Sequence, residues 1–110
     1  MDRVDRARAY YEAIDDGEYD RLRGLLADGF CHERSDLTLE GPDEFVRFMR
    51  DERPETDTSH VVETVYTADG GVAVEGELRR ADGSVWFRFV DVFAFADGRL
   101  AGLRTYTHSG

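Results

Sequence analysis

The residue whose surroundings most strongly suggest chemistry is Asp91, a carboxylate in the strand-like stretch of residues 84–96. Side chains alternate between the two faces of a strand, so Asp91 shares its face with Val85, Phe87, Phe89, Phe93 and Phe95. An unpaired charge among such rings is costly, so the carboxyl group must take up a proton or find a partner. Two interpretations stay open: a structural hydrogen bond or ion pair, and the polar group of a ligand pocket floored by those rings.

The other reactive residue types form no recognisable catalytic or metal-binding motif. His32, His60 and His108 do not share a spacing typical of metal ligands, and no cysteine or carboxylate completes a known pattern. Cys31 precedes His32 directly, and neighbours on a strand point to opposite faces, so a nucleophilic pair is not expected. The sequence has no glycine-rich phosphate loop and no nucleophile elbow. We therefore expect neither a metal nor a cofactor.

The acidic composition excludes one class of partner. The chain has 110 residues, enough for one domain, and 24 acidic against 14 basic residues give a net charge of −10. Nucleic-acid binding begins with phosphate neutralisation and is therefore not expected. We hypothesise a halophilic protein from a cytosol at molar salt, where the Debye length is only about 3 Å and an acidic surface repels itself little.

The sequence also predicts a soluble, cytoplasmic protein without membrane contact. No apolar run approaches the length that crosses a bilayer, and the N-terminus is charged from Asp2 onward, unlike a signal peptide. The single cysteine, Cys31, cannot form an internal disulfide and fits a reducing compartment.

Periodic patterns predict the elements that must position Asp91. Apolar residues at three- and four-residue spacing, with helix start and stop signals, predict helices over residues 2–16, 19–27 and 42–53. Alternating and extended patterns predict strands near residues 30–34, 37–39, 58–67, 72–80, 84–96 and 99–108. Asp-Gly turns join the last four into an antiparallel meander, in which the Asp91 stretch is central. The segregated helices and strands predict an α+β domain over residues 1–110, with helices covering one face of a curved sheet.

Four segments in this order resemble the nuclear transport factor 2-like superfamily, in its SnoaL-like and ketosteroid isomerase-like branch. The segments are residues 10–17 (YYEAIDDG), 25–30 (LLADGF), 40–45 (EGPDEF) and 91–100 (DVFAFADGRL). The resemblance covers nearly the whole chain. It implies a cone-shaped curved antiparallel sheet wrapped over three N-terminal helices, the cystatin-like α+β barrel, with a pocket at the wide end. That fold hosts isomerases, cyclases, dehydratases and binding subunits, so it implies no single function.

The resemblance also implies roles for particular residues. In ketosteroid isomerase-like proteins, a Tyr on the first helix and a protonated Asp on the central strand donate to a developing oxyanion. Tyr10 and Asp91 stand at these places, seven residues before Gly17 and Gly98 respectively. The catalytic Asp base of that branch falls on Arg34, so the base is not matched and steroid isomerisation is not expected.

The last strand supplies further candidates for the pocket. Continuous alternation would place on the pocket side Leu100, Gly102, Arg104, Tyr106 and His108. An inward Arg104 would give Asp91 a cationic partner and favour its ionised form. Either these two form a structural pair, or they line a site for a small polar or anionic molecule together with Tyr10 and with Arg34 or His108.

Three functions remain compatible with these residues. The first is an enzyme that transfers a proton on a small metabolite, with Glu33, Asp36 or His32 as the base. The second is a non-catalytic domain that binds a small-molecule ligand in the same pocket, over Phe87 and Phe89, with Arg104 pairing a carboxylate of the ligand. The third is a dimeric interaction protein whose cone is filled by Phe48, Phe87 and Phe89.

The outer face of the central strand predicts a partner. If helices cover only the other face, an apolar patch is formed by Trp86, Val90, Val92, Ala94, Ala101 and Leu103. We expect a two-fold homodimer through this patch.

Overall fold

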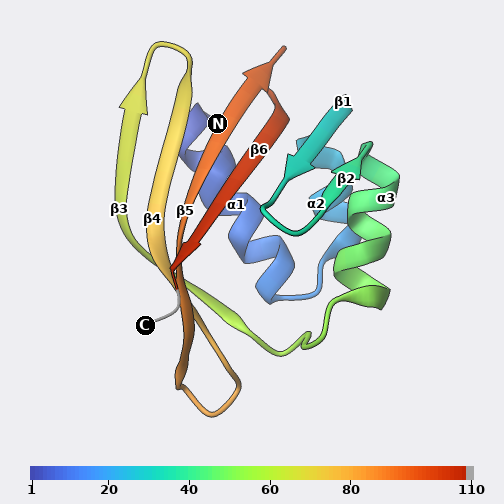
Figure 1. Ribbon diagram of the computed structural model, residues 1–110. Coiled ribbons are helices and arrows are strands. Elements are labelled where there is room, and N and C mark those ends of the chain that lie inside the picture. Colours follow the sequence, from blue (N-terminus) through green and yellow to red (C-terminus); the bar gives the residue numbers. More distant parts are fainter. Residues whose placement is uncertain (109–110) are drawn as a thin grey trace.

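The computed structural model describes residues 1–108 and shows three α-helices packed on one face of a six-stranded sheet (Figure 1). The helices are α1 (Arg3–Asp15), α2 (Tyr19–Leu25) and α3 (Pro42–Arg47), which a π-helical turn, η1 (Phe48–Glu52), continues. The strands are β1 (Leu26–Glu33), β2 (Thr38–Glu40), β3 (Ser59–Ala68), β4 (Gly71–Arg79), β5 (Val85–Ala96) and β6 (Arg99–His108). The predicted α+β cone is confirmed.

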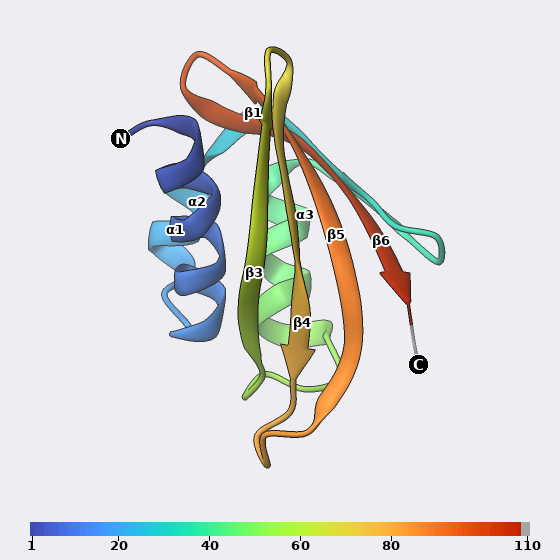
Figure 2. The same ribbon diagram turned by 90° about the vertical axis from the view of Figure 1, so that its left-hand side faces the viewer.

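The strand that carries Asp91 lies inside the sheet, as predicted. The sheet order is β2-β1-β6-β5-β4-β3, and the meander from β3 to β6 is antiparallel throughout. β1 joins the other edge of β6 in parallel. β5 bends along its length, and the end of the β4–β5 hairpin extends past the helices (Figure 2).

Local signals at both ends fix the first helix. The Asp2 side chain accepts a hydrogen bond from the Asp5 backbone N–H at 2.8 Å, and the Asp5 carboxylate reaches back to the Asp2 N–H, which forms a capping box. Gly17 follows the helix with a φ of 68°, a left-handed conformation that glycine adopts without strain. Within residues 1–108, none of the helices has the length and apolar character needed to span a membrane.

One unpaired residue in β6 decides which of its side chains face the helices. The pairing of β5 with β6 skips Ala101, because the partner positions pass from Leu100 directly to Gly102. The skipped residue is a β-bulge, and the alternation beyond it is displaced by one position. Thr105 therefore lies opposite Asp91.

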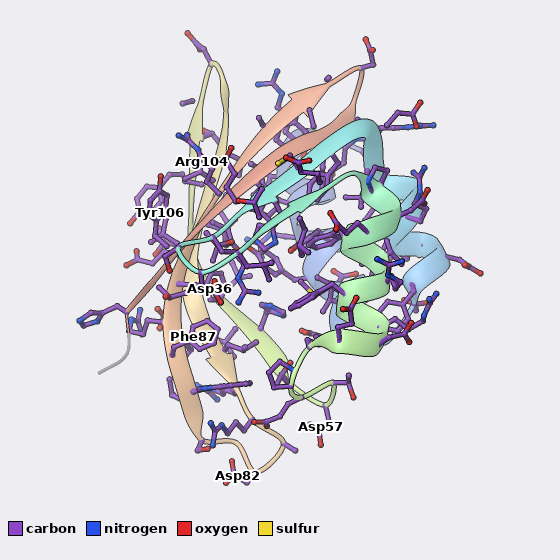
Figure 3. The ribbon with its side chains drawn as sticks, turned by 45° about the vertical axis from the view of Figure 1, so that its right-hand side comes forward. Asp36, Asp57, Asp82, Phe87, Arg104 and Tyr106 are labelled. Atoms are coloured by element: carbon purple, nitrogen blue, oxygen red, sulfur yellow. The ribbon has the colours of Figure 1, made fainter. Side chains whose placement is uncertain are left out.

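The prediction of which β6 side chains point toward the pocket is consequently wrong beyond Leu100. Leu100 is buried as expected, but Arg104, Tyr106 and His108 are exposed. Figure 3 shows Arg104 and Tyr106 on the side of the sheet away from the helices. The predicted ion pair between Arg104 and Asp91 does not form, because the bulge turns the guanidinium to the outer face.

The outer face keeps only part of the predicted apolar patch. Val90 and Val92 are half-buried there, and Ala94 is exposed. Leu103 is buried on the helix side instead, because it follows the bulge, and Trp86 lines the cavity described below. The homodimer through this smaller patch stays a prediction.

Candidate functional site

A cavity of about 440 Å³ lies between the sheet, α1 and the segment from η1 to the start of β3. Its volume falls within the range of small-molecule sites. Arg104 and His108 lie outside it, but five of the seven residues predicted for the site line it: Tyr10, Arg34, Phe87, Phe89 and Asp91. The two phenylalanines form part of the wall and leave the cone unfilled. Phe87 and Asp36 of the β1–β2 turn, both labelled in Figure 3, line the cavity.

Asp91 is only 5% exposed, and both of its oxygens accept hydrogen bonds. Tyr11 Oη donates to Oδ2 at 2.6 Å, and Thr105 Oγ1 donates to Oδ1 at 2.6 Å. Burial raises the pKa of the Asp91 carboxyl group, and the hydrogen bonds from Thr105 and Tyr11 oppose this only in part. Asp91 is therefore easier to protonate than an exposed aspartate.

Tyr11, which is not among the predicted site residues, is the helix residue that donates a hydrogen bond to Asp91. Successive helix residues point about 100° apart. Tyr11 places its hydroxyl on Asp91 and its ring against Phe89, both in β5, whereas the Tyr10 ring packs against Phe45 of α3 and Phe93 of β5. Both tyrosines fit the apolar stripe of the helix, so the spacing alone could not distinguish their roles.

The Tyr10 hydroxyl nevertheless belongs to the cavity wall. Among the described residues none accepts a hydrogen bond from it, and it is not one of the fully enclosed polar atoms. Burial, and then the charge of Asp91, hold the pKa of Tyr10 well above its usual value, so the hydroxyl keeps its proton. It can therefore donate a hydrogen bond to a ligand oxygen.

His32 extends the Asp91 network through Thr105. Its Nε2 lies 2.7 Å from Thr105 Oγ1, the hydroxyl that donates to Asp91. Burial, with the charge of Arg34, lowers the pKa of His32 to about 4, so the ring is neutral at pH 7. Its Nδ1 is enclosed and has no hydrogen-bond partner among the described residues. His32, one of the predicted bases, lines the cavity, but its Nε2 is engaged by Thr105 and its Nδ1 is enclosed.

The two carboxylates predicted as bases are not free in the cavity either. Asp36 lines it but accepts two hydrogen bonds from the Arg34 guanidinium, at 3.2 and 3.1 Å. Glu33 is exposed and lies outside this cavity. Arg34 itself lines the cavity as predicted, with its guanidinium over the Phe48 ring at 5.7 Å from the centroid.

A histidine–carboxylate pair that sequence reasoning missed also belongs to the cavity wall. His60, at the start of β3, holds Nδ1 at 2.6 Å from Asp15 Oδ1, and its backbone N–H donates to Oδ2 at 2.9 Å. The His60 and Asp15 side chains are 15% and 22% exposed, and His60 lines the cavity. Because Nδ1 faces a carboxylate, it carries the proton of the neutral ring, and Nε2 is left as an acceptor. None of residues 1–108 forms a hydrogen bond with that Nε2.

Only a weak signal in the sequence could have indicated this pair. Asp15 is the last residue of α1, and a carboxylate at the negative end of a helix dipole is disfavoured by about 0.3–1 kcal/mol. The last turn of α1 has no basic residue to offset this cost. Since His60 is 45 positions further along the chain, no short motif links the two.

The cavity wall thus contains His60, whose Nε2 has no hydrogen-bond partner among residues 1–108, and Tyr10, whose hydroxyl donates to none of them. A paired imidazole can remove a proton, and a hydroxyl donor can stabilise the negative charge that results. Over residues 1–108, no group of three His, Cys, Asp or Glu side chains converges in a way that could hold a metal ion.

Comparisons with known proteins confirm the resemblance. A family model described as SnoaL-like domain matches residues 7–103. A nuclear transport factor 2-like protein of unknown function from Cytophaga hutchinsonii superposes with a TM-score of 0.84 at 13% identity, over 98% of this chain and 91% of that chain. A provisionally named SnoaL-like polyketide cyclase from Jannaschia sp. CCS1 gives 0.79 at 21% identity, over 96% and 84%.

An epoxide hydrolase of the LEH-like type from M. tuberculosis has the same fold, with a TM-score of 0.83 at 16% identity over 96% of this chain and 82% of that chain. Comparison with curated proteins gave no significant match. At these identities the solved structures establish the fold and not the reaction.

Proposed function

We propose that this chain, which belongs to the SnoaL-like domain family, is an enzyme that moves a proton on a small substrate bound in the cone cavity. The observation that carries the proposal is His60 in the cavity wall, with Nδ1 held 2.6 Å from Asp15 Oδ1. Structural neighbours named as a cyclase and an epoxide hydrolase support an enzyme without selecting the reaction.

His60 is the general base in this scheme. The neutral ring accepts a substrate proton at Nε2, and the Asp15 carboxylate stabilises the imidazolium that forms. Positioned bases of this kind accelerate reactions by about 10²–10⁴-fold. The proton balance closes when the imidazolium returns the proton to a different atom of the substrate, which gives an isomer.

Tyr10 stabilises the charge that the departing proton leaves behind. When a proton is removed beside a carbonyl group, negative charge develops on the carbonyl oxygen, and a donor already in place lowers the barrier. Tyr10 lines the cavity, and its hydroxyl keeps its proton. Asp91 lines the same cavity, and hydrogen bonds from Tyr11 and Thr105 hold its carboxyl group in place.

The test uses 5-nitrobenzisoxazole, a planar probe that opens to a coloured phenolate when a base removes its C–H proton. We expect saturable turnover, with kcat/KM falling by about 100-fold or more in His60→Gln, because the amide cannot act as the base. Asp15→Asn should cause a comparable loss, because it removes the carboxylate that fixes the ring tautomer. His108→Gln, on the outer face, is the matched control and should keep full activity.

Two outcomes would count against the proposal. One is the absence of turnover by the wild-type protein, which would favour a binding domain without chemistry. The other is unchanged turnover in His60→Gln. Thermal melts of each variant by circular dichroism establish that any loss reflects chemistry and not unfolding.

A further inference from the structure

The charged side chains that line the cavity differ in how their charges are compensated. Arg34 is paired with Asp36, and Glu55 lies 3.6 Å from the guanidinium of Arg80. Arg53 also lines the cavity, but no carboxylate of residues 1–108 lies within ion-pair distance of it. In a chain with 24 acidic residues, a cation in a cavity wall without an acidic partner is unexpected.

The Arg53 guanidinium is held in place by neutral oxygens only. Nε donates to the Met49 carbonyl at 2.6 Å, and Nη1 donates to Thr58 Oγ1 at 3.3 Å. Nη2 lies 3.3 Å from Tyr19 Oη and 3.4 Å from the Thr56 carbonyl. Guanidinium has five N–H groups, so at least one stays free of these partners. The group is thus oriented before any ligand arrives, and its positive charge is not neutralised.

The position of Arg53 relates this charge to the reactive groups. Thr58, which accepts from Arg53, is buried and lies two residues before His60 on the same segment. Arg53, His60 and Tyr10 all line the same cavity of about 440 Å³. An anionic group beside Arg53 would therefore leave the rest of a small molecule within reach of His60 and Tyr10.

The remaining wall of the cavity is largely apolar. It is formed in part by Ile14, Phe48, Leu78, Trp86, Phe87 and Phe89. Such a wall favours a flat or branched hydrocarbon body, and guanidinium is the side chain best suited to bind a carboxylate through paired hydrogen bonds.

We infer that the ligand of this cavity is a small carboxylate with an apolar body, whose carboxylate group binds Arg53. The inference rests on the proposed function only for the claim that the ligand then reacts, because binding at Arg53 does not require His60. It replaces the anion site expected at Arg104, which lies on the outer face.

The test compares 2-naphthoate with 2-naphthamide, two probes of nearly equal shape that differ in charge, by calorimetric titration in dilute buffer. The wild-type protein should bind 2-naphthoate about tenfold more tightly or better, because a charged acceptor strengthens the hydrogen bonds of a guanidinium. Arg53→Met should abolish this preference. Arg104→Met, which removes an exposed guanidinium from the outer face, should retain it.

Equal affinity for the two probes, no binding of either, or a preference that persists in Arg53→Met would each overturn the inference. Should Arg53→Met fail to fold, the Nε–H signal of Arg53 in the ¹⁵N-labelled wild-type protein replaces it. That signal should shift with 2-naphthoate and stay in place with 2-naphthamide, and the reverse result would refute carboxylate binding at this residue.

His60→Gln separates the two proposals. It should keep the wild-type preference for 2-naphthoate, because His60 is not part of the Arg53 contact set. A preference without turnover of 5-nitrobenzisoxazole would contradict the enzyme and support the carboxylate site. Turnover that depends on His60, without a preference for 2-naphthoate, would support the enzyme and contradict the carboxylate site.

Discussion

Asp91 and His32 are joined through Thr105, yet their titrations affect stability in opposite directions. Burial raises the pKa of Asp91 above 3.8, so the stability that this group contributes is lost as pH rises through its folded value. Burial lowers the pKa of His32 from 6.5 to about 4, so the unfolded chain binds this proton first as pH falls. Stability from His32 is therefore lost between pH 6.5 and pH 4.

We predict that His32→Gln removes this acid sensitivity. The Gln amide can still donate to Thr105 Oγ1 but does not titrate. Between pH 7 and pH 4, the unfolding free energy of the wild-type protein should fall by about 3 kcal/mol more than that of the variant. The size follows from the lowered pKa of His32, because each pKa unit corresponds to about 1.4 kcal/mol. Urea unfolding at the two pH values, followed by the fluorescence of Trp86, measures the difference. If that difference does not change with pH, His32 is not buried in its neutral form.

The residues of the site were predictable from the sequence to different degrees. Asp91 was found because a carboxylate in a row of phenylalanines breaks the local pattern. Asp15 and His60 were missed because each is ordinary within its own helix or strand, and their pairing arises only when the end of α1 meets the start of β3. Arg53 was missed for a similar reason, since its distinguishing feature is the absence of an acidic partner in space.

At the scale of elements, the existence of each strand was easier to predict than the direction of its side chains. The strand expected over residues 99–108 is observed at Arg99–His108, and its Asp-Gly turn is present. Hydrophobic alternation does not reveal an unpaired residue, however, because a bulge leaves the composition of the strand unchanged. Ala101 therefore placed Thr105 where Arg104 was expected.

We predict that deletion of Ala101 costs less stability than insertion of one alanine after Leu103. The deletion removes the residue that has no partner, so β6 can pair continuously and Thr105 stays opposite Asp91. The insertion brings Arg104 to that position and removes the Thr105 hydroxyl that joins Asp91 to His32, so buried polar groups lose their partners, with an expected loss of about 3 kcal/mol. The urea midpoints of the two variants give the comparison. Equal losses of stability would mean that the bulge does not determine which β6 side chains point toward the helices.

At the scale of the whole molecule, charge is the dominant property. The net charge of −10 is carried by a body only 38 × 29 × 26 Å in extent. In dilute buffer the Debye length is about 30 Å, so every acidic group on this surface repels the others. At molar salt the Debye length is about 3 Å, and the repulsion is confined to immediate neighbours.

We predict that the melting temperature rises by about 5 °C or more from dilute buffer to multimolar KCl, which corresponds to roughly 1 kcal/mol for a chain of this size. Salts can also stabilise proteins through apolar burial, so a charge-reduced variant is needed to identify the cause. Asp16→Asn with Asp57→Asn suits this purpose, because both carboxylates are exposed and neither forms an ion pair among residues 1–108. Asp57 lies on the loop before β3 (Figure 3).

The variant separates screening from burial because the two mechanisms predict different curves. If screening is the cause, the variant melts above the wild-type protein in dilute buffer, and the two converge as KCl is added. If burial is the cause, the two curves rise in parallel, because the apolar core is the same in both. A wild-type melting temperature that does not change with KCl would refute adaptation to molar salt, and the acidic surface would then need another explanation.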